Sequence, residues 1–335
     1  MNAKIRRILV AIEHTDSMPV SLIHKAAYLA RQSGARIELF HAIADLRPMA
    51  PSERMTKTET EDWRAEVASF RLRRLERFGR SRTLEGISVG CTVVWDSSAY
   101  RAIVRRVLAT PTDLVVAGTH RHTIRARLAT ESIDWELVRE CPVPLLIVKS
   151  RRSYQDRDVV AAVDPFHAHD KPANLDTRLL QIGRGFARLF GGKLHIFHAY
   201  MPLVPVETLP MAPMAPLIAM PPELEPLHEQ QMQQELDRLA RSARIPKADR
   251  HLQLGQVASE LGPLTRALRA GLIVMGAVSR SGVRRLLIGN TAERILDGVP
   301  CDVLVVKPAR FKSTVSAAKP LMRLRSAARH SSAHV

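Results

Sequence analysis

The segment 275–291 contains the residues best placed for chemistry, because it follows a short apolar run and leads into a helical pattern. In an open α/β sheet, ligands bind beyond the carboxyl ends of the strands, where helix N-termini present free N–H groups. We therefore expect a small-ligand site formed by this segment together with Asp164, which ends the strand-like run at residues 158–163. The expected ligand-binding residues are Asp164, Met275, Gly276, Ser279, Gly289, Asn290 and Thr291.

Other combinations of polar residues do not form a recognisable catalytic site. The sequence contains no Walker A loop, G-x-S-x-G elbow or HExxH motif, and no Rossmann fingerprint follows a first strand. The pairs His120/His122 and His167/His169 each bring two imidazoles together, but no third metal ligand is evident. His41 and His198 end matching strands, which favours structural roles. We predict a protein that is not an enzyme and requires no metal.

Four segments recur in the same order, which indicates a duplicated chain. Residues 8–13 match 159–164, residues 37–42 match 194–199, residues 114–118 match 272–276, and residues 142–149 match 300–307. The offset between the matching segments changes little along the chain. We predict an N-terminal domain at residues 1–150, a C-terminal domain at residues 151–310 and a disordered basic tail at residues 311–335.

Each copy alternates strand-like apolar runs with helical patterns, which predicts an α/β fold with a doubly wound parallel sheet in each domain. Runs such as Leu114–Ala117 and Leu145–Val148 are continuously apolar, as expected for strands covered on both faces. Gly34 is placed to end the first helix. The ten expected strands are residues 7–13, 36–42, 88–95, 113–117, 144–149, 158–163, 193–199, 250–254, 271–275 and 302–307.

Two further segments differ from this plan. Residues 201–222 contain seven prolines and four methionines, so we expect an extended apolar loop: a plain linker, a lid or a docking arm. The chain has a net charge of +17, but its aromatic content is 4% and most of its charge is mixed in sign. Nucleic-acid binding is therefore expected, if at all, through the tail at residues 311–335, which has five basic residues and no acidic one.

The length of the apolar runs and the spacing of the cysteines indicate the cellular compartment of the protein. No apolar run approaches the roughly 18 residues needed to cross a membrane, and no signal-peptide pattern opens the chain. Cys91, Cys141 and Cys301 lie far apart and form no CxxC pair. We expect buried, reduced thiols and a cytoplasmic protein.

The segment 276–291 resembles the nucleotide loop of the universal stress protein family, whose nucleotide-binding members follow G-x2-G-x9-G-(S/T). Gly276 and Gly289 occupy the first and last glycine positions, Ser279 replaces the second glycine, and Asn290 replaces the Ser or Thr. Asp164 matches the acidic residue that contacts the nucleoside. The resemblance implies a fold of the adenine-nucleotide-hydrolase type and an ATP- or AMP-type ligand in the C-terminal domain.

The same loop is broken in the first copy, where Arg121 and Glu131 replace glycines and Glu13 replaces the Asp. Residues 132–144 and 289–293 resemble the two halves of E-type tandem members, over roughly residues 4–310. The resemblance implies that residues 145–149 and 303–307 pair to join the halves, and it leaves open whether two chains form a homodimer. We therefore expect a stress-response binding protein; the alternative is a lipid or apolar-ligand carrier with residues 201–222 as its lid.

Overall fold

The computed structural model describes residues 5–43, 56–119, 133–166, 174–202, 224–277, 294–296, 298–316 and 322–326. The N-terminal half contains β1 (Arg7–Ala11), α1 (Val20–Ser33), β2 (Arg36–Ile43), α2 (Lys57–Gly79), β3 (Val89–Trp95), α3 (Ala99–Ala109), β4 (Leu114–Gly118), α4 (Ile133–Glu140) and β5 (Leu145–Val148). The C-terminal half contains β6 (Val159–Ala162), α5 (Asn174–Phe190), β7 (Leu194–Tyr200), α6 (Leu224–Ser242), β8 (Arg250–Leu254), α7 (Val257–Ala267), β9 (Leu272–Gly276) and β10 (Asp302–Val306). A last strand, β11, covers Met322–Arg325.

The strands of both halves join one sheet with the order β11-β3-β2-β1-β4-β5-β10-β9-β6-β7-β8 among the described residues. Within each half the neighbouring strands are parallel, as in the pairs β1–β2 and β6–β7. The ten expected strands are all present, with small shifts at their ends. The predicted α/β fold with two tandem, largely parallel domains is confirmed.

Local signals in the sequence explain where the first helices begin and end. Thr56 caps α2, because its Oγ1 accepts a hydrogen bond from the Glu59 N–H while the Glu59 carboxylate accepts from the Thr56 N–H at 2.7 Å. Gly34 ends α1 with a left-handed φ of 70°, as the sequence predicts. These caps fix where α1 and α2 start or stop, and therefore how they lie against the sheet.

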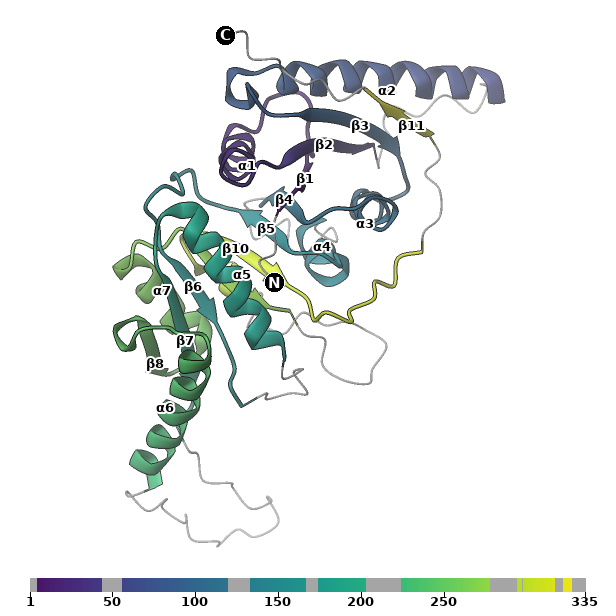
Figure 1. The fold of residues 1–335 in the computed structure, drawn as a ribbon. Helices are drawn as coiled ribbons and strands as arrows, with labels where there is room; N and C mark the ends of the chain where they lie inside the picture. Colours follow the sequence, from purple (N-terminus) through teal and green to yellow (C-terminus); the bar gives the residue numbers. More distant parts are fainter. Residues whose placement is uncertain are drawn as a thin grey trace, which may run out of the picture.

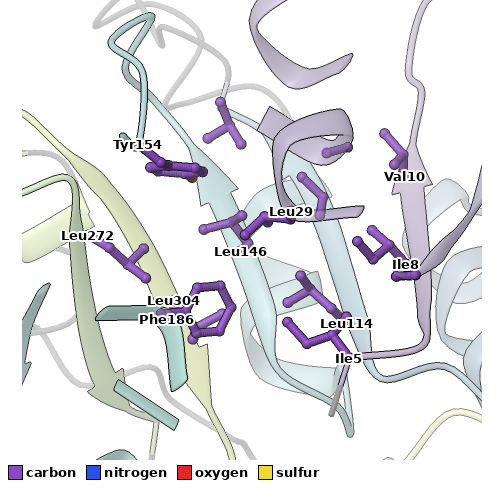
Figure 2. Packing of buried hydrophobic residues seen from close by; sticks show 14 of the residues in the cluster. Ile5, Ile8, Val10, Leu29, Leu114, Leu146, Tyr154, Phe186, Leu272 and Leu304 are labelled. Carbon is purple, nitrogen blue, oxygen red and sulfur yellow. The ribbon is translucent and has the colours of Figure 1, made fainter. Parts of the chain in front are cut away.

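Helices cover both faces of the sheet (Figure 1). On one face, α1, α2, α5 and α6 contribute to a single apolar cluster, and on the other face α3, α4 and α7 contribute to a second. Each cluster contains side chains from both halves of the chain. Figure 2 shows Leu146 of the first half beside Leu304 of the second, with Leu114 and Leu272 of the same cluster farther out on either side of the joint. The core is therefore continuous across the joint between the halves.

The halves join through antiparallel pairing of β5 with β10, in which Leu146 lies opposite Leu304. This confirms the pairing expected for residues 145–149 and 303–307. Antiparallel pairing at the joint covers the edge of each half-sheet, which would otherwise expose unpaired backbone donors.

A buried carboxylate lies beside this joint. Asp302 of β10 is fully buried and accepts hydrogen bonds from Lys25 Nζ and from the Tyr154 hydroxyl, each at 2.6 Å. The N–H groups of Lys149 and Ser150 donate to its other oxygen at 2.9 and 2.7 Å. Lys25 lies on α1, so this cluster connects the first half, the connection between the halves and the second half.

The C-terminal segment differs in part from the predicted disordered tail. Glu140 at the end of α4 accepts hydrogen bonds from the hydroxyls of Ser313 and Thr314, each at 2.7 Å. Farther along, β11 pairs antiparallel with β3, with Arg325 opposite Thr92. The prediction of disorder was wrong for residues 322–325, because Met322 and Leu324 pack against the apolar cluster beside α2 while Arg323 and Arg325, which alternate with them, stay exposed. Figure 1 shows the segment returning from β10 to the first half.

Candidate functional site

The candidate site lies where β6 and β9 end side by side. The two strands are parallel neighbours, with Ala162 opposite Met275, so Asp164 and Gly276 follow at the same carboxyl edge. On its other side β6 pairs with β7, which comes next in the sequence. The order β9-β6-β7 therefore makes this a topological switch point, where open α/β sheets form ligand crevices.

The structure describes three of the expected site residues, and it gives each a different environment. Asp164 is half-buried beyond the end of β6. The side chain of Met275 is 5% exposed and belongs to the apolar cluster beside α7, so it contributes packing. Gly276 is the last residue of β9. The other four expected residues lie outside the described residues: Ser279, Gly289, Asn290 and Thr291.

Gly276 has a packing reason to be glycine. A Cβ at this position would lie 2.8 Å from Cδ2 of Leu175, which is fully buried in the first turn of α5. The missing side chain therefore lets α5 pack closely over the end of β9. This reason is independent of any phosphate, and sequence analysis did not foresee it.

Two carboxylates lie close to the end of β6. The N–H of Asp164 donates to Oδ1 of Asp176 at 3.2 Å, and Asp176 is almost fully buried in the first turn of α5. Carboxylates suit partners that donate hydrogen bonds, such as hydroxyl or amino groups, and they repel phosphates. Sequence analysis missed Asp176; its position in the first turn of a predicted helix was the available signal.

His41 and His198 occupy matching positions in the two halves, and each makes the same contact with a backbone carbonyl oxygen, which agrees with the predicted structural role. His41 Nδ1 lies 2.8 Å from the Ile12 carbonyl oxygen, and His198 Nδ1 lies 3.0 Å from that of Val163. A carbonyl oxygen is an acceptor, so each ring carries a proton on Nδ1. Burial lowers the pKa of His41, which favours a neutral ring. Both rings therefore hold the end of the neighbouring first strand of their half.

The corresponding edge of the first half, at the carboxyl ends of β1 and β4, has different contacts. Gly118 ends β4 and, among the residues that the structure describes, no atom lies within 4 Å of a Cβ built on it, in contrast to Gly276. Two arginines of α2 hold the connection between β1 and α1: Arg71 donates to Thr15 Oγ1 at 2.8 Å and Arg74 donates to the Thr15 carbonyl at 2.5 Å. His120, Arg121, His122 and Glu131 lie outside the described residues.

Among the described residues, neither the cysteine thiols nor any group of potential metal ligands forms an evident reactive site. Cys91, Cys141 and Cys301 are free and buried, as predicted, and burial raises the pKa of each thiol, to about 11, 12 and 12 in that order. Such thiols carry little thiolate at neutral pH. Among the residues that the structure describes, no group of three or more His, Cys, Asp or Glu side chains is placed to hold a metal ion. His167 and His169 are not among them.

Comparison with known proteins agrees with this architecture. The model of the universal stress protein family matches residues 4–149 and 158–307. The chain belongs to the universal stress protein family. Universal stress protein E of Photorhabdus laumondii is 27% identical over 320 residues, covering 95% of this chain and 99% of the relative. Universal stress protein E of Escherichia coli is 25% identical over 315 residues, covering 93% and 97%. The chain is therefore a tandem, E-type universal stress protein.

Solved structures of universal stress proteins share the fold. A putative universal stress protein from Pseudomonas aeruginosa has a TM-score of 0.65 and 22% identity, covering 92% of this chain and 95% of that one. A universal stress protein from Archaeoglobus fulgidus has a TM-score of 0.56 and 15% identity, covering 89% and 98%. Within the described residues, no helix of this universal stress protein is long and apolar enough to cross a membrane.

Proposed function

We propose that this universal stress protein is a cytoplasmic, non-enzymatic binding protein that holds a small ligand at the carboxyl edge of its C-terminal half. The observation that carries the proposal is the position of Asp164 and Gly276 at the ends of adjacent parallel strands, at a topological switch point. A ligand bound there contacts both the β6–α5 connection and the segment after β9. Ligand binding would therefore change the contacts of the β6–α5 connection and of the segment after β9, and partner proteins would recognise this change.

An adenine nucleotide of the ATP or AMP type fits the residues in this part of the chain. Asp164 and Asp176 favour the hydrogen-bond donors of a ribose or an amino group at one end of the site. Gly289, Asn290 and Thr291 supply the sequence features of a phosphate loop, in which Asn290 also suits a helix N-cap. The proposed ligand would thus direct its nucleoside toward β6 and its phosphates toward the segment 289–291.

Calorimetric titration with ATP and with AMP tests this proposal. We expect a dissociation constant below about 1 mM for the parent protein. Gly289→Asp should abolish the binding, because it places a negative charge in the phosphate loop, and Asp164→Ala should weaken it. Glu13→Ala is the matched control, since Glu13 is the corresponding residue of the first half. Absence of saturable binding below about 1 mM, or equal losses in Glu13→Ala and Asp164→Ala, would overturn the nucleotide proposal.

The alternative function, an apolar-ligand or lipid carrier, has one observation in its favour. Met201, Leu224 and Leu227 flank residues 203–223 and are 53%, 38% and 58% exposed. Three exposed apolar side chains near one segment offer a surface for an apolar ligand. Residues 203–223, which include most of the predicted lid, lie outside the described residues. Native mass spectrometry of the purified protein separates the functions, because a co-purified lipid and a co-purified nucleotide differ in mass.

A further inference from the structure

A polar cavity of about 210 Å³ lies at the edge of the sheet opposite to the candidate site. It is formed where β1, β2 and β3 begin, together with the connection from α3 to β4 and the end of β11. The charged side chains that line it are Arg7, Arg36, Glu38, Arg106 and Arg325. Four arginines and one glutamate therefore face a single small space.

The glutamate does not neutralise this cavity, because its charge is already shared with one of the arginines. Glu38 Oε1 accepts hydrogen bonds from Arg106 Nε at 2.9 Å and from Thr92 Oγ1 at 2.6 Å, and Arg106 Nη2 lies 2.8 Å from the same oxygen. The remaining three arginines have no acidic partner among the lining residues. The cavity therefore carries an excess of positive charge.

Arg106 supplies a buried donor without a partner. Its side chain is 4% exposed, and within the described part of the chain its Nη1 has no hydrogen-bond partner. A buried donor left unsatisfied destabilises the fold, and more so when it is charged. The guanidinium plane presents its N–H groups in a fixed fork that matches the oxygens of phosphate or carboxylate.

We propose that this cavity binds a small oxyanion, namely inorganic phosphate or the phosphoryl group of a small metabolite, with the guanidinium group of Arg106 at its buried side. Arg7, Arg36 and Arg325 surround the anion and balance its charge. The cavity is smaller than the roughly 300–1,000 Å³ of sites for drug-sized ligands, so a nucleotide is not its ligand. The site lies in the other half of the chain from the proposed nucleotide site and is independent of it.

Binding at this site is linked to the C-terminal segment. Arg325 and Ser326 line the cavity, and the Ser326 N–H donates to the Cys91 carbonyl at 3.1 Å as β11 runs along β3. The pKa of Arg323 is lowered by burial and by the nearby charges of Arg106 and Arg325. An anion in the cavity relieves this repulsion between arginines. The anion therefore stabilises the pairing of β11 with β3, since a ligand stabilises the state to which it binds.

Calorimetric titrations of the full chain with sodium phosphate, sodium sulfate and glycerol 3-phosphate, at constant ionic strength, test the proposal. We expect saturable phosphate binding in the millimolar range or tighter, about fivefold or more weakened in Arg325→Gln and lost in Arg106→Met. Arg73→Gln, which removes one exposed charge from α2 outside the cavity, is the control and should bind as the parent does. Tighter binding of glycerol 3-phosphate than of phosphate identifies a metabolite as the ligand, and the reverse identifies the free anion.

Hydrogen exchange provides a second measurement that does not depend on the Arg106 variant. Phosphate should slow the exchange of amides in residues 322–326 and 92–95, and Arg325→Gln should remove this protection. If Arg106→Met does not fold, Arg325→Gln decides the matter, because Arg325 is exposed and its substitution leaves the core intact. No saturable phosphate binding below about 10 mM, or equal affinities for Arg325→Gln and Arg73→Gln, would overturn the proposal.

Discussion

Lys307 is a charged side chain in an almost fully buried place. It follows β10, is 4% exposed, and its Nζ lies 4.7 Å from the centre of the Phe311 ring. Burial lowers its pKa from 10.5 to about 8, although Cys141 and Glu140 oppose the shift. The folded protein therefore releases this proton at a lower pH than the unfolded chain does.

We predict that this shift makes stability depend on pH in a definite direction. Between about pH 8 and 10.5 the unfolded chain binds the proton and the folded protein does not, so the contribution of Lys307 to the free energy of unfolding rises with pH, by up to about 3 kcal/mol. Lys307→Met should be more stable than the parent at pH 7, and this advantage should shrink across the window. Denaturant unfolding at a series of pH values checks it; a difference that is constant with pH would contradict it.

Residue types alone did not reveal what several single positions do. The sequence places Gly276 in a phosphate loop, whereas the structure places Leu175 of α5 against it. Such a contact joins residues far apart in the chain, so no local pattern reports it. The histidines were easier to interpret, because His41 and His198 recur in both copies and a duplicated position with the same surroundings is expected to keep the same contact.

At the scale of elements, the ends of β4 and β9 offer a matched pair of glycines. Gly118 and Gly276 are each the last residue of the fourth strand of their half, but within the described residues a Cβ at Gly118 meets no other atom, whereas a Cβ at Gly276 meets Leu175. Leu175 is fully buried, so it has little room to move. The two glycines therefore test whether the packing of α5 over β9 requires glycine.

We predict that Gly276→Ala destabilises the protein by about 1–3 kcal/mol, because the added methyl group overpacks the contact with α5. Gly118→Ala should change the free energy of unfolding by less than about 0.5 kcal/mol. Neither substitution changes the net charge, and each variant differs from the parent by one methyl group. Urea unfolding at equilibrium measures the difference; equal effects of the two substitutions would show that α5 adapts to a Cβ at Gly276.

The elements that sequence reasoning predicted are those with a strong local pattern. Runs such as Leu114–Ala117 are apolar throughout, and their strands appear where expected. The segment Met322–Arg325 has only two apolar residues, so its strand depends on the open edge of β3 and on the apolar face of α2. A strand that forms because it pairs with the edge of a strand far away in the sequence has only a weak pattern in its own residues.

At the scale of the whole molecule, the two halves share one sheet and two apolar clusters, so we expect them to unfold as one cooperative unit. Asp302 connects the two halves, because its carboxylate accepts hydrogen bonds from Lys25, Tyr154 and two backbone N–H groups at the joint. Burial lowers the pKa of Lys25, and Asp302 opposes this shift through its charge and its hydrogen bond. Without the carboxylate, a buried ammonium would remain with no counter-charge beside it.

We predict that Asp302→Asn costs about 3–5 kcal/mol, the usual loss when one member of a buried ion pair is removed. The double variant Lys25→Met with Asp302→Asn should recover part of this loss, because it also removes the stranded charge. Scanning calorimetry should show one transition for the parent, since the cores of the two halves are continuous. Two resolved transitions in the parent, or no recovery in the double variant, would contradict this view of the joint.

The return of the chain end to the first half affects how the protein is made on the ribosome. β3 is complete early in synthesis, but the strand that covers its outer edge is translated only after the entire second half. Throughout that interval a nascent chain offers an uncovered edge with unpaired backbone donors and acceptors, which is a template for association with other chains. Molecules truncated by early termination would keep this edge open permanently, so we expect aggregation to mark incomplete products more strongly than the finished protein.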